Sequence, residues 1–244
     1  MLYDAFVLIV SVLAAAVASI TGFGIGSLLT PTLTIATDTK VAVAAVSLPH
    51  FVGTGIRLAM MRTSVDRRVL WRFGLASAAG GLTGALLHGS LASPWLSVVF
   101  GLLLIFVAVS EMTGLARRMQ FRGSVALVAG TLSGLFGGLV GNQGGIRSAA
   151  LLGFDLPKRT FVATATAVGL IVDLARMPVY LATEGNEIVE IWRMVAIATA
   201  GVVVGTLFGG RLLSRIPESK FRAIVAAILA ALGAWMLTQA AQSM

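Results

Sequence analysis

The sequence has no cysteine, which excludes disulfide bonds, thiolate metal sites and thiol redox chemistry. Charged residues are scarce, at 11% of the 244 positions, whereas 57% are hydrophobic. With a mean hydropathy of +0.95, the chain has too few polar residues to cover a soluble domain, so its solvent is lipid. Hydrophobic stretches follow one another from Leu2 to Ala240 with only short charged breaks. We therefore predict an all-α polytopic membrane protein whose main partner is the lipid bilayer.

Histidine is also rare, with only His50 and His88 present, and no cluster of metal-ligating residues or nucleophile–base pair is apparent. These absences disfavour a membrane enzyme, and we expect no metal and no other cofactor. The net charge of +8 could suggest a nucleic-acid partner. However, the arginines gather in short breaks between hydrophobic stretches, which is the pattern that orients membrane proteins. We therefore expect no nucleic-acid partner.

Eight hydrophobic segments can be distinguished, and six have about the 20 residues that a helix needs to cross the bilayer hydrocarbon. The first and the fifth are longer, and each contains a glycine cluster, TGFGIG at 21–26 and GNQGG at 141–145. Glycine weakens a helix, so we expect both segments to break there. The segments are Leu2–Ala36, Val41–Met61, Val69–Gly89, Trp95–Thr113, Ser124–Phe154, Thr160–Ala182, Trp192–Leu213 and Phe221–Ala240.

The sequence repeats itself with a shift of about half its length. Gly22 and Gly141 are 119 positions apart, as are Arg57 and Arg176. Farther on, the Trp-Arg pair at 71–72 recurs at 192–193, with a shift of 121. We predict a single membrane domain made of two repeats, residues 1–122 and 123–244. Each repeat contains one glycine-broken segment and three ordinary spans.

Charge predicts how the two broken segments lie. If all eight segments crossed, the basic residues of the breaks would divide evenly between the two sides, against the positive-inside rule. If the broken segments turn back as re-entrant hairpins, all of these basic residues except Lys40 and Arg193 share one side. The breaks on that side are 62–72, 114–122, 155–159 and 211–222. This model predicts six crossings, inverted repeats, both termini in the periplasm, and a solvated periplasmic loop formed by the acidic stretch 183–190.

Inverted repeats whose broken segments meet at mid-membrane are typical of secondary transporters that work by alternating access. The free N–H groups at the start of each half-helix attract an anion, and arginine offers it a planar fork of donors. We therefore predict a mid-membrane anion site. Its candidate residues are Thr21, Gly22, Gly24, Gly26, Arg57, Asn142, Gln143, Gly144, Gly145, Arg147 and Arg176.

Structural roles for the ionisable residues stay open beside these functional ones. Arg57 and Arg176 could extend to the headgroups, and Arg147 could cap hairpin carbonyls. Asp173 lies three residues before Arg176, so it is a candidate either for proton coupling or for a structural ion pair. His50 is likewise a candidate proton carrier or a packed, hydrogen-bonded core residue. Small-residue ridges on three helices predict close helix packing, and they contain Gly80, Gly84, Gly130, Gly134, Gly138, Gly201, Gly205 and Gly209.

The stretches SITGFGIGSLLTP and AGTLSGLFGGLVGNQGGIRSAALL resemble the glycine-rich motif that occurs twice in the TauE/SafE family of sulfite and organosulfonate exporters. The similarity covers essentially the whole chain. It implies a bacterial inner-membrane carrier of a small sulfur-containing or carboxylated anion, often directed outward. In the second copy, Asn142, Gln143 and Arg147 stand where the family commonly has small or apolar residues, and no proline matches Pro31. These departures suggest an anion with more than one charged end.

From this resemblance we expect a carrier that exports sulfite or an organosulfonate such as sulfoacetate. The alternatives are an anion channel, which would use the same donors along a continuous pore, and an uptake carrier for a small carboxylate. Faces rich in glycine and alanine also leave a homodimer open.

Overall fold

The computed structural model describes residues 1–244 except 116–120, 122, 143 and 214–217, and among the described residues it contains helices and no strands. For residues 210–213, 218, 219 and 221 it describes the backbone alone. The all-α polytopic fold is thus confirmed. The α-helices are α1 (Leu2–Thr21), α2 (Ile25–Leu33), α3 (Thr39–Met61), α4 (Arg67–Ser90), α5 (Ser93–Thr113), α7 (Ser124–Val140), α8 (Gly144–Leu152), α9 (Lys158–Glu190), α10 (Trp192–Leu213) and α11 (Glu218–Ser243), with a 3₁₀ turn at Arg62–Ser64.

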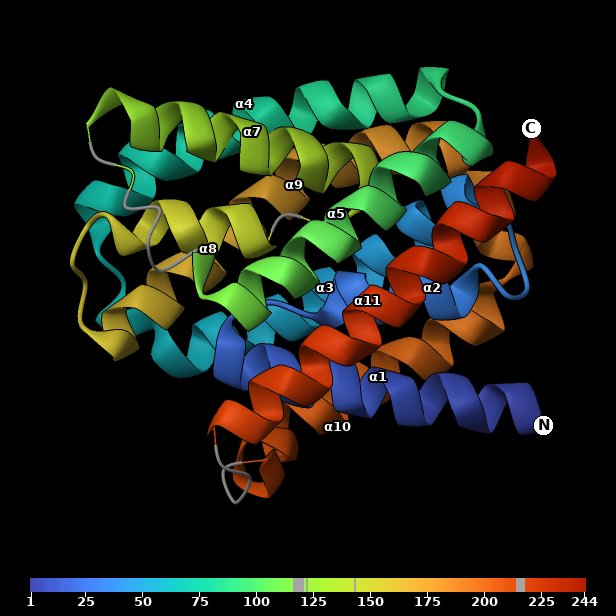
Figure 1. Cartoon of the computed structure of the whole chain (residues 1–244), viewed down its shortest axis with the longest axis horizontal. Coiled ribbons are helices and arrows are strands. Elements are labelled where there is room, and N and C mark those ends of the chain that lie inside the picture. Colours follow the sequence, from blue (N-terminus) through green and yellow to red (C-terminus); the bar gives the residue numbers. More distant parts are fainter. Residues whose placement is uncertain (116–120, 122, 143, 214–217) are drawn as a thin grey trace.

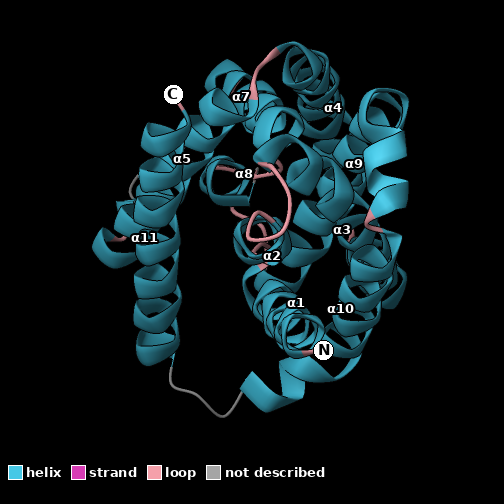
Figure 2. Cartoon of the chain, turned by 90° about the vertical axis from the view of Figure 1, so that its right-hand side faces the viewer, coloured by secondary structure: helices cyan, strands magenta, loops and turns pink. Residues whose placement is uncertain are grey.

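The two long hydrophobic segments break at glycines, as expected. α1 ends at Gly22, with φ of 82°, and α7 ends at Gly141, with φ of 74°. This left-handed conformation favours glycine and ends a helix by turning the chain away from its axis. The chain then enters α2 and α8, which have only nine residues each. Figure 2, which looks along the bundle, shows these two short helices near its centre, surrounded by the longer ones.

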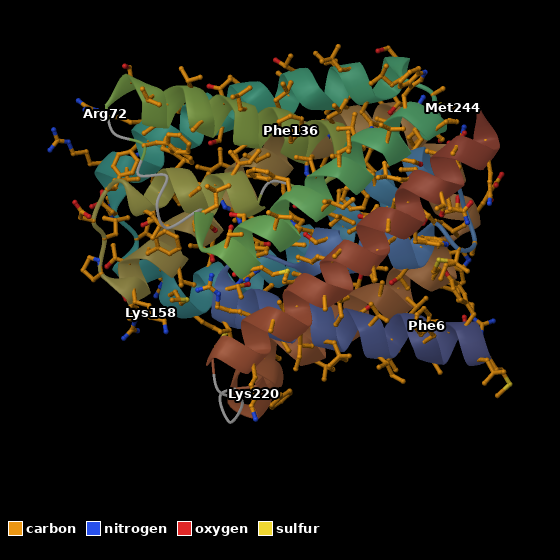
Figure 3. The ribbon with its side chains drawn as sticks, in the orientation of Figure 1. Phe6, Arg72, Phe136, Lys158, Lys220 and Met244 are labelled. Atoms are coloured by element: carbon orange, nitrogen blue, oxygen red, sulfur yellow. The ribbon has the colours of Figure 1, made fainter. Side chains whose placement is uncertain are left out.

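Both ends of the chain lie at the same end of the bundle, on the right of Figure 1, although not next to each other. Arg72 and Lys158, from two of the predicted basic breaks, lie at the opposite end from Met244 (Figure 3). Parts of the other two basic breaks, 114–122 and 211–222, fall outside the described residues. Among the described residues, six helical segments are long and apolar enough to cross a membrane, namely Leu2–Thr21, Thr39–Ser64, Ser93–Thr113, Lys158–Glu190, Trp192–Gly209 and Arg222–Ser243. This set includes α1, which we expected to turn back, and omits α4, which we expected to cross.

The predicted small-residue ridges lie where helices pack most closely. A Cβ atom on Gly134 would lie 1.8 Å from the carbonyl oxygen of Ser77, and one on Gly138 would lie 1.9 Å from that of Gly81. These contacts join α7 to α4. On α10, a Cβ on Gly205 would lie 2.2 Å from the carbonyl oxygen of Val12 on α1. The ridges therefore let backbones approach each other directly, as small residues do in membrane helices.

The expectation of a solvated acidic loop at 183–190 is wrong for the loop and for Glu184, whereas Glu187 and Glu190 are exposed as expected. α9 continues to Glu190 through a kink at Glu184, whose φ is −123°. Glu184 is buried, and its carboxylate lies 3.4 Å from the Nζ atom of Lys40. This ion partner offsets much of the cost of burying the carboxylate, so the helix does not have to end before the glutamate.

Candidate functional site

The broken segments meet at their tips, inside the bundle. A Cβ atom on Gly26 would lie 2.4 Å from the carbonyl oxygen of Gly141, and one on Gly144 would lie 2.0 Å from Cβ of Phe23. Only glycine allows the two tips to pack this closely. The Ser27 hydroxyl also donates to Oδ1 of Asn142 across the contact, at 3.3 Å. Residues more than one hundred positions apart in the sequence thus form one site.

A small polar cavity lies at this contact. Its volume is about 10 Å³, which is room for roughly one water molecule. A sulfite or sulfonate group is larger, so the structure has the tips in a contracted arrangement. The cavity is lined by Phe23, Gly24, Gly26, Ser27, His50, Gly141, Asn142, Gly144 and Arg147.

Arg147 places an incompletely bonded guanidinium at the cavity. The side chain lies within the first turn of α8 and is only 2% exposed. Its Nη2 atom donates to the carbonyl oxygen of Gly22, at 3.0 Å, whereas Nε and Nη1 have no hydrogen-bond partner among the described residues. Nδ2 of Asn142 is buried without a partner as well. Buried donors normally have acceptors, because leaving them unpaired costs free energy. The cavity therefore collects donors that an anion would satisfy.

Arg57 and Arg176 hold the helix ends that lead into the two tips. Nη1 of Arg57 donates to the carbonyl oxygen of Ala18, and Nη1 of Arg176 donates to that of Gly137. Each of these oxygens also accepts the N–H of the glycine that ends its helix. Both arginines are buried, so neither side chain extends to the headgroups, and neither lines the cavity.

A buried carboxylate, that of Asp173, forms a contact ion pair with Arg176 and acts on Arg57 and Arg147 only at longer range. Asp173 accepts from Nε of Arg176 through Oδ1, at 3.0 Å, and its Oδ2 atom lies 2.6 Å from Nδ1 of His50. The guanidinium of Arg176 also lies 5.6 Å from the ring centroid of Tyr180. Among the described residues, no carboxylate forms an ion pair with Arg57 or with Arg147. The core of the bundle thus contains two positive charges without a partner of their own.

The structure brings most of the predicted site residues together, but not all. Gly24, Gly26, Asn142, Gly144 and Arg147 line the cavity, and Gly22 lies behind it through its bond to Arg147.

Two of the other predicted residues lie elsewhere. The Thr21 hydroxyl bonds to Val17 and Phe23 and closes its own turn. Gly145 packs against Val107, where a Cβ would lie 2.6 Å from the valine side chain. The predicted residue Gln143 lies outside the described part of the chain. Ser27 and Phe23 line the cavity without having been predicted, since nothing in their types distinguishes them from other residues near a turn.

Comparison with known families identifies the family of the chain. Residues 7–236 match the model of a family described as sulfite exporter TauE/SafE. The match covers nearly the whole chain and includes both glycine tips and all three buried arginines. No curated protein and no solved structure matches the chain.

Proposed function

The chain belongs to the TauE/SafE family of sulfite exporters, and from this premise we propose that it exports sulfite or an organosulfonate such as sulfoacetate across a bacterial inner membrane. The family implies a membrane transporter of an anion and not an enzyme. A carrier of this kind binds its substrate at mid-membrane and exposes it to one side at a time. The two predicted inverted repeats, residues 1–122 and 123–244, would provide that motion.

The observation that carries the proposal is the incompletely bonded guanidinium of Arg147 at the tip contact. Among the described residues, Nε and Nη1 have no acceptor on a side chain that is 2% exposed, and the planar fork of arginine matches the oxygens of a sulfonate or carboxylate. An uncompensated charge inside a membrane is costly, so an anionic ligand is its natural partner. Because Arg57 adds a second uncompensated charge, the site favours a dianion over a monoanion.

Transport requires the tips to separate, since the cavity at their contact admits about one water molecule. Outward movement of an anion is favoured by a potential that is negative inside, by about 2.3 kcal/mol per charge per 100 mV. Export is therefore possible without a driving ion. Counterflow, in which unlabelled anion on one side stimulates exit of labelled anion, distinguishes this carrier from an anion channel with linear conductance.

Calorimetric binding to purified protein tests the role of Arg147. The panel of anions is sulfite, thiosulfate, sulfoacetate, taurine and simple carboxylates. Arg147→Ala should weaken binding of the preferred anion by roughly 1.5–3 kcal/mol, the range for a hydrogen bond to a charged group. Arg147→Lys should retain part of the affinity, because it keeps the charge and loses the fork. The matched control is Arg193→Ala, whose exposed side chain pairs with Asp4 near the chain ends. Wild-type affinity in Arg147→Ala would place the site elsewhere.

The orientation that we propose has both termini in the periplasm. The two basic residues that the charge pattern leaves on that side each have an acidic partner. Lys40 lies 3.4 Å from Glu184, and Arg193 lies 3.2 Å from Asp4. In the four breaks on the other side, basic residues far outnumber acidic ones in the sequence, which supports a cytoplasmic location for them.

Single-cysteine labelling tests the orientation, because the native chain has no cysteine. On intact cells, a membrane-impermeant maleimide should label Ser243→Cys. It should label Arg159→Cys only after the membrane is opened. Both native side chains are exposed, so neither substitution disturbs the core. Labelling of position 159 but not 243 on intact cells would reverse the proposed orientation.

A further inference from the structure

His50 lies where the anion site meets the buried ion pair of α9. Its ring lines the tip cavity together with Asn142 and Arg147. Its Nδ1 atom is 2.6 Å from Oδ2 of Asp173. Because Arg176 holds the other oxygen of that carboxylate, at 2.8–3.0 Å, Asp173 is charged and can only accept. The proton between them therefore belongs to Nδ1 of His50, and Nε2 is the atom at which the ring gains or loses a proton.

Burial of His50 and the guanidinium groups near it oppose a second proton when no anion is present, whereas the carboxylate of Asp173 favours one. α9 supplies the carboxylate of Asp173 and the guanidinium of Arg176, which neutralise each other. α8 adds Arg147, and α3 itself carries Arg57 one turn beyond Thr54. Ser27 on α2 and Thr206 on α10 are neutral, and α5, which also packs against α3, meets it through the neutral pair Thr39 and Ser97. Arg147 is the positive charge that lines the cavity together with His50.

We infer that His50 binds one proton together with the anion, so that the cavity is a joint site for both. The inference rests on the proposed function, because it requires an anion between the tips. An anion there offsets the charges of Arg147 and Arg57, and a proton from water then forms an N–H bond at Nε2 that points toward the anion. No bond of the anion forms or breaks. Asp173 positions the ring and stays charged throughout.

Proton and anion binding are then linked, and linkage is reciprocal. If the anion favours the proton, the proton must favour the anion by the same factor. Affinity for the anion rises as the pH falls through the range in which His50 titrates, by up to about tenfold per pH unit for one proton. A dianion carried with one proton also moves one net negative charge, whereas the dianion alone moves two.

The second histidine of the chain provides a matched control. His88 is also fully buried, and its Nδ1 atom lies 2.8 Å from the carbonyl oxygen of Leu139. Its ring packs against Tyr180, with centroids 5.0 Å apart, and does not line the tip cavity. A proton taken up on anion binding should therefore depend on His50 and not on His88.

The test is calorimetric titration of the full-length protein with sulfoacetate between pH 6 and 8, in pairs of buffers with different ionisation enthalpies. Both acidic groups of this probe stay ionised in that range, whereas sulfite itself titrates near neutral pH. For the wild type we expect the apparent heat to depend on the buffer, with uptake of up to one proton per anion. His50→Asn keeps a donor for Asp173 and cannot titrate, so its affinity should be independent of pH and of buffer. His88→Asn should behave as the wild type.

The outcomes separate this inference from the proposed function. Binding by the wild type with no proton uptake at any pH in the range would overturn the inference and leave the carrier intact. Proton uptake retained in His50→Asn would do the same. If the wild type binds neither sulfoacetate nor sulfite, the proposed function fails, and the inference fails with it. The wild-type measurement can overturn the inference even if a variant does not fold.

Discussion

Arg57 on α3 and Arg176 on α9 make the same contact in two different electrostatic settings. The two residues are 119 positions apart, and each donates to the carbonyl that precedes a glycine tip. Three residues before Arg176 lies Asp173, whereas the corresponding residue before Arg57 is the neutral Thr54. The shared part is a clamp on a helix end. The difference is the charge: on α9 the carboxylate of Asp173 pairs with Arg176, whereas on α3 Arg57 has no carboxylate in contact.

Removing each arginine should give the largest contrast between the two helices. Arg176→Met leaves the buried Asp173 without its guanidinium, and losing one partner of a buried pair costs about 3–5 kcal/mol. Arg57→Met breaks one charged hydrogen bond and strands no carboxylate, so its cost should not exceed roughly 1.5–3 kcal/mol. Unfolding in mixed micelles, followed by tryptophan fluorescence, measures both free energies.

A second substitution checks the cause of that contrast. In the Arg176→Met background, Asp173→Asn should restore part of the free energy of unfolding, because it removes the unpaired carboxylate. In the wild-type background, the same substitution should lower the free energy of unfolding. Equal losses for the two arginine variants would show that the clamp matters and the charge of Asp173 does not.

A smaller loss of stability is expected at the close helix contacts of α4 with α7 and of α1 with α10. Comparing the two contacts tests whether both depend on glycine in the same way. Gly138→Ala and Gly205→Ala would each force a methyl group within about 2 Å of a backbone oxygen, and such overpacking typically costs about 1–3 kcal/mol. Gly55→Ala is the control. A Cβ there meets nothing within 4 Å, so we expect a gain of about 0.4–1 kcal/mol from the less flexible unfolded chain. A neutral Gly138→Ala variant would mean that α4 and α7 separate easily.

Local features of the fold could be predicted from the sequence, and long-range contacts could not. The glycine clusters predicted both helix breaks, and the spacing of Asp173 and Arg176 indicated a pair on one helix face. In contrast, His50 and Asp173 lie 123 positions apart, and Arg147 and Gly22 lie 125 apart. Such contacts depend on which helices pack together, and the pattern of one helix does not specify its partner.

The error at Glu184 has the same origin. Its acidic surroundings in the sequence indicated a solvated loop, because the residue that neutralises it, Lys40, lies on another helix. The family and its transport function followed from the glycine motifs themselves, which are local. The substrate site and the division at residues 122 and 123 stay predictions, although the order of the helices is compatible with two similar halves.

The seam between α1 and α10 has a consequence for how the protein is made. α10 begins at Trp192, so at a synthesis rate of about 5–20 residues per second α1 remains without this partner for roughly 10–40 seconds. During that interval the hydroxyl groups in the second half of α1 need no other helix. The hydroxyl groups of Ser11, Ser19 and Thr21 each donate to a carbonyl four residues earlier in α1 itself. With these hydroxyl groups satisfied internally, the part of α1 from Ser11 to Thr21 can lie in hydrocarbon before α10 is made.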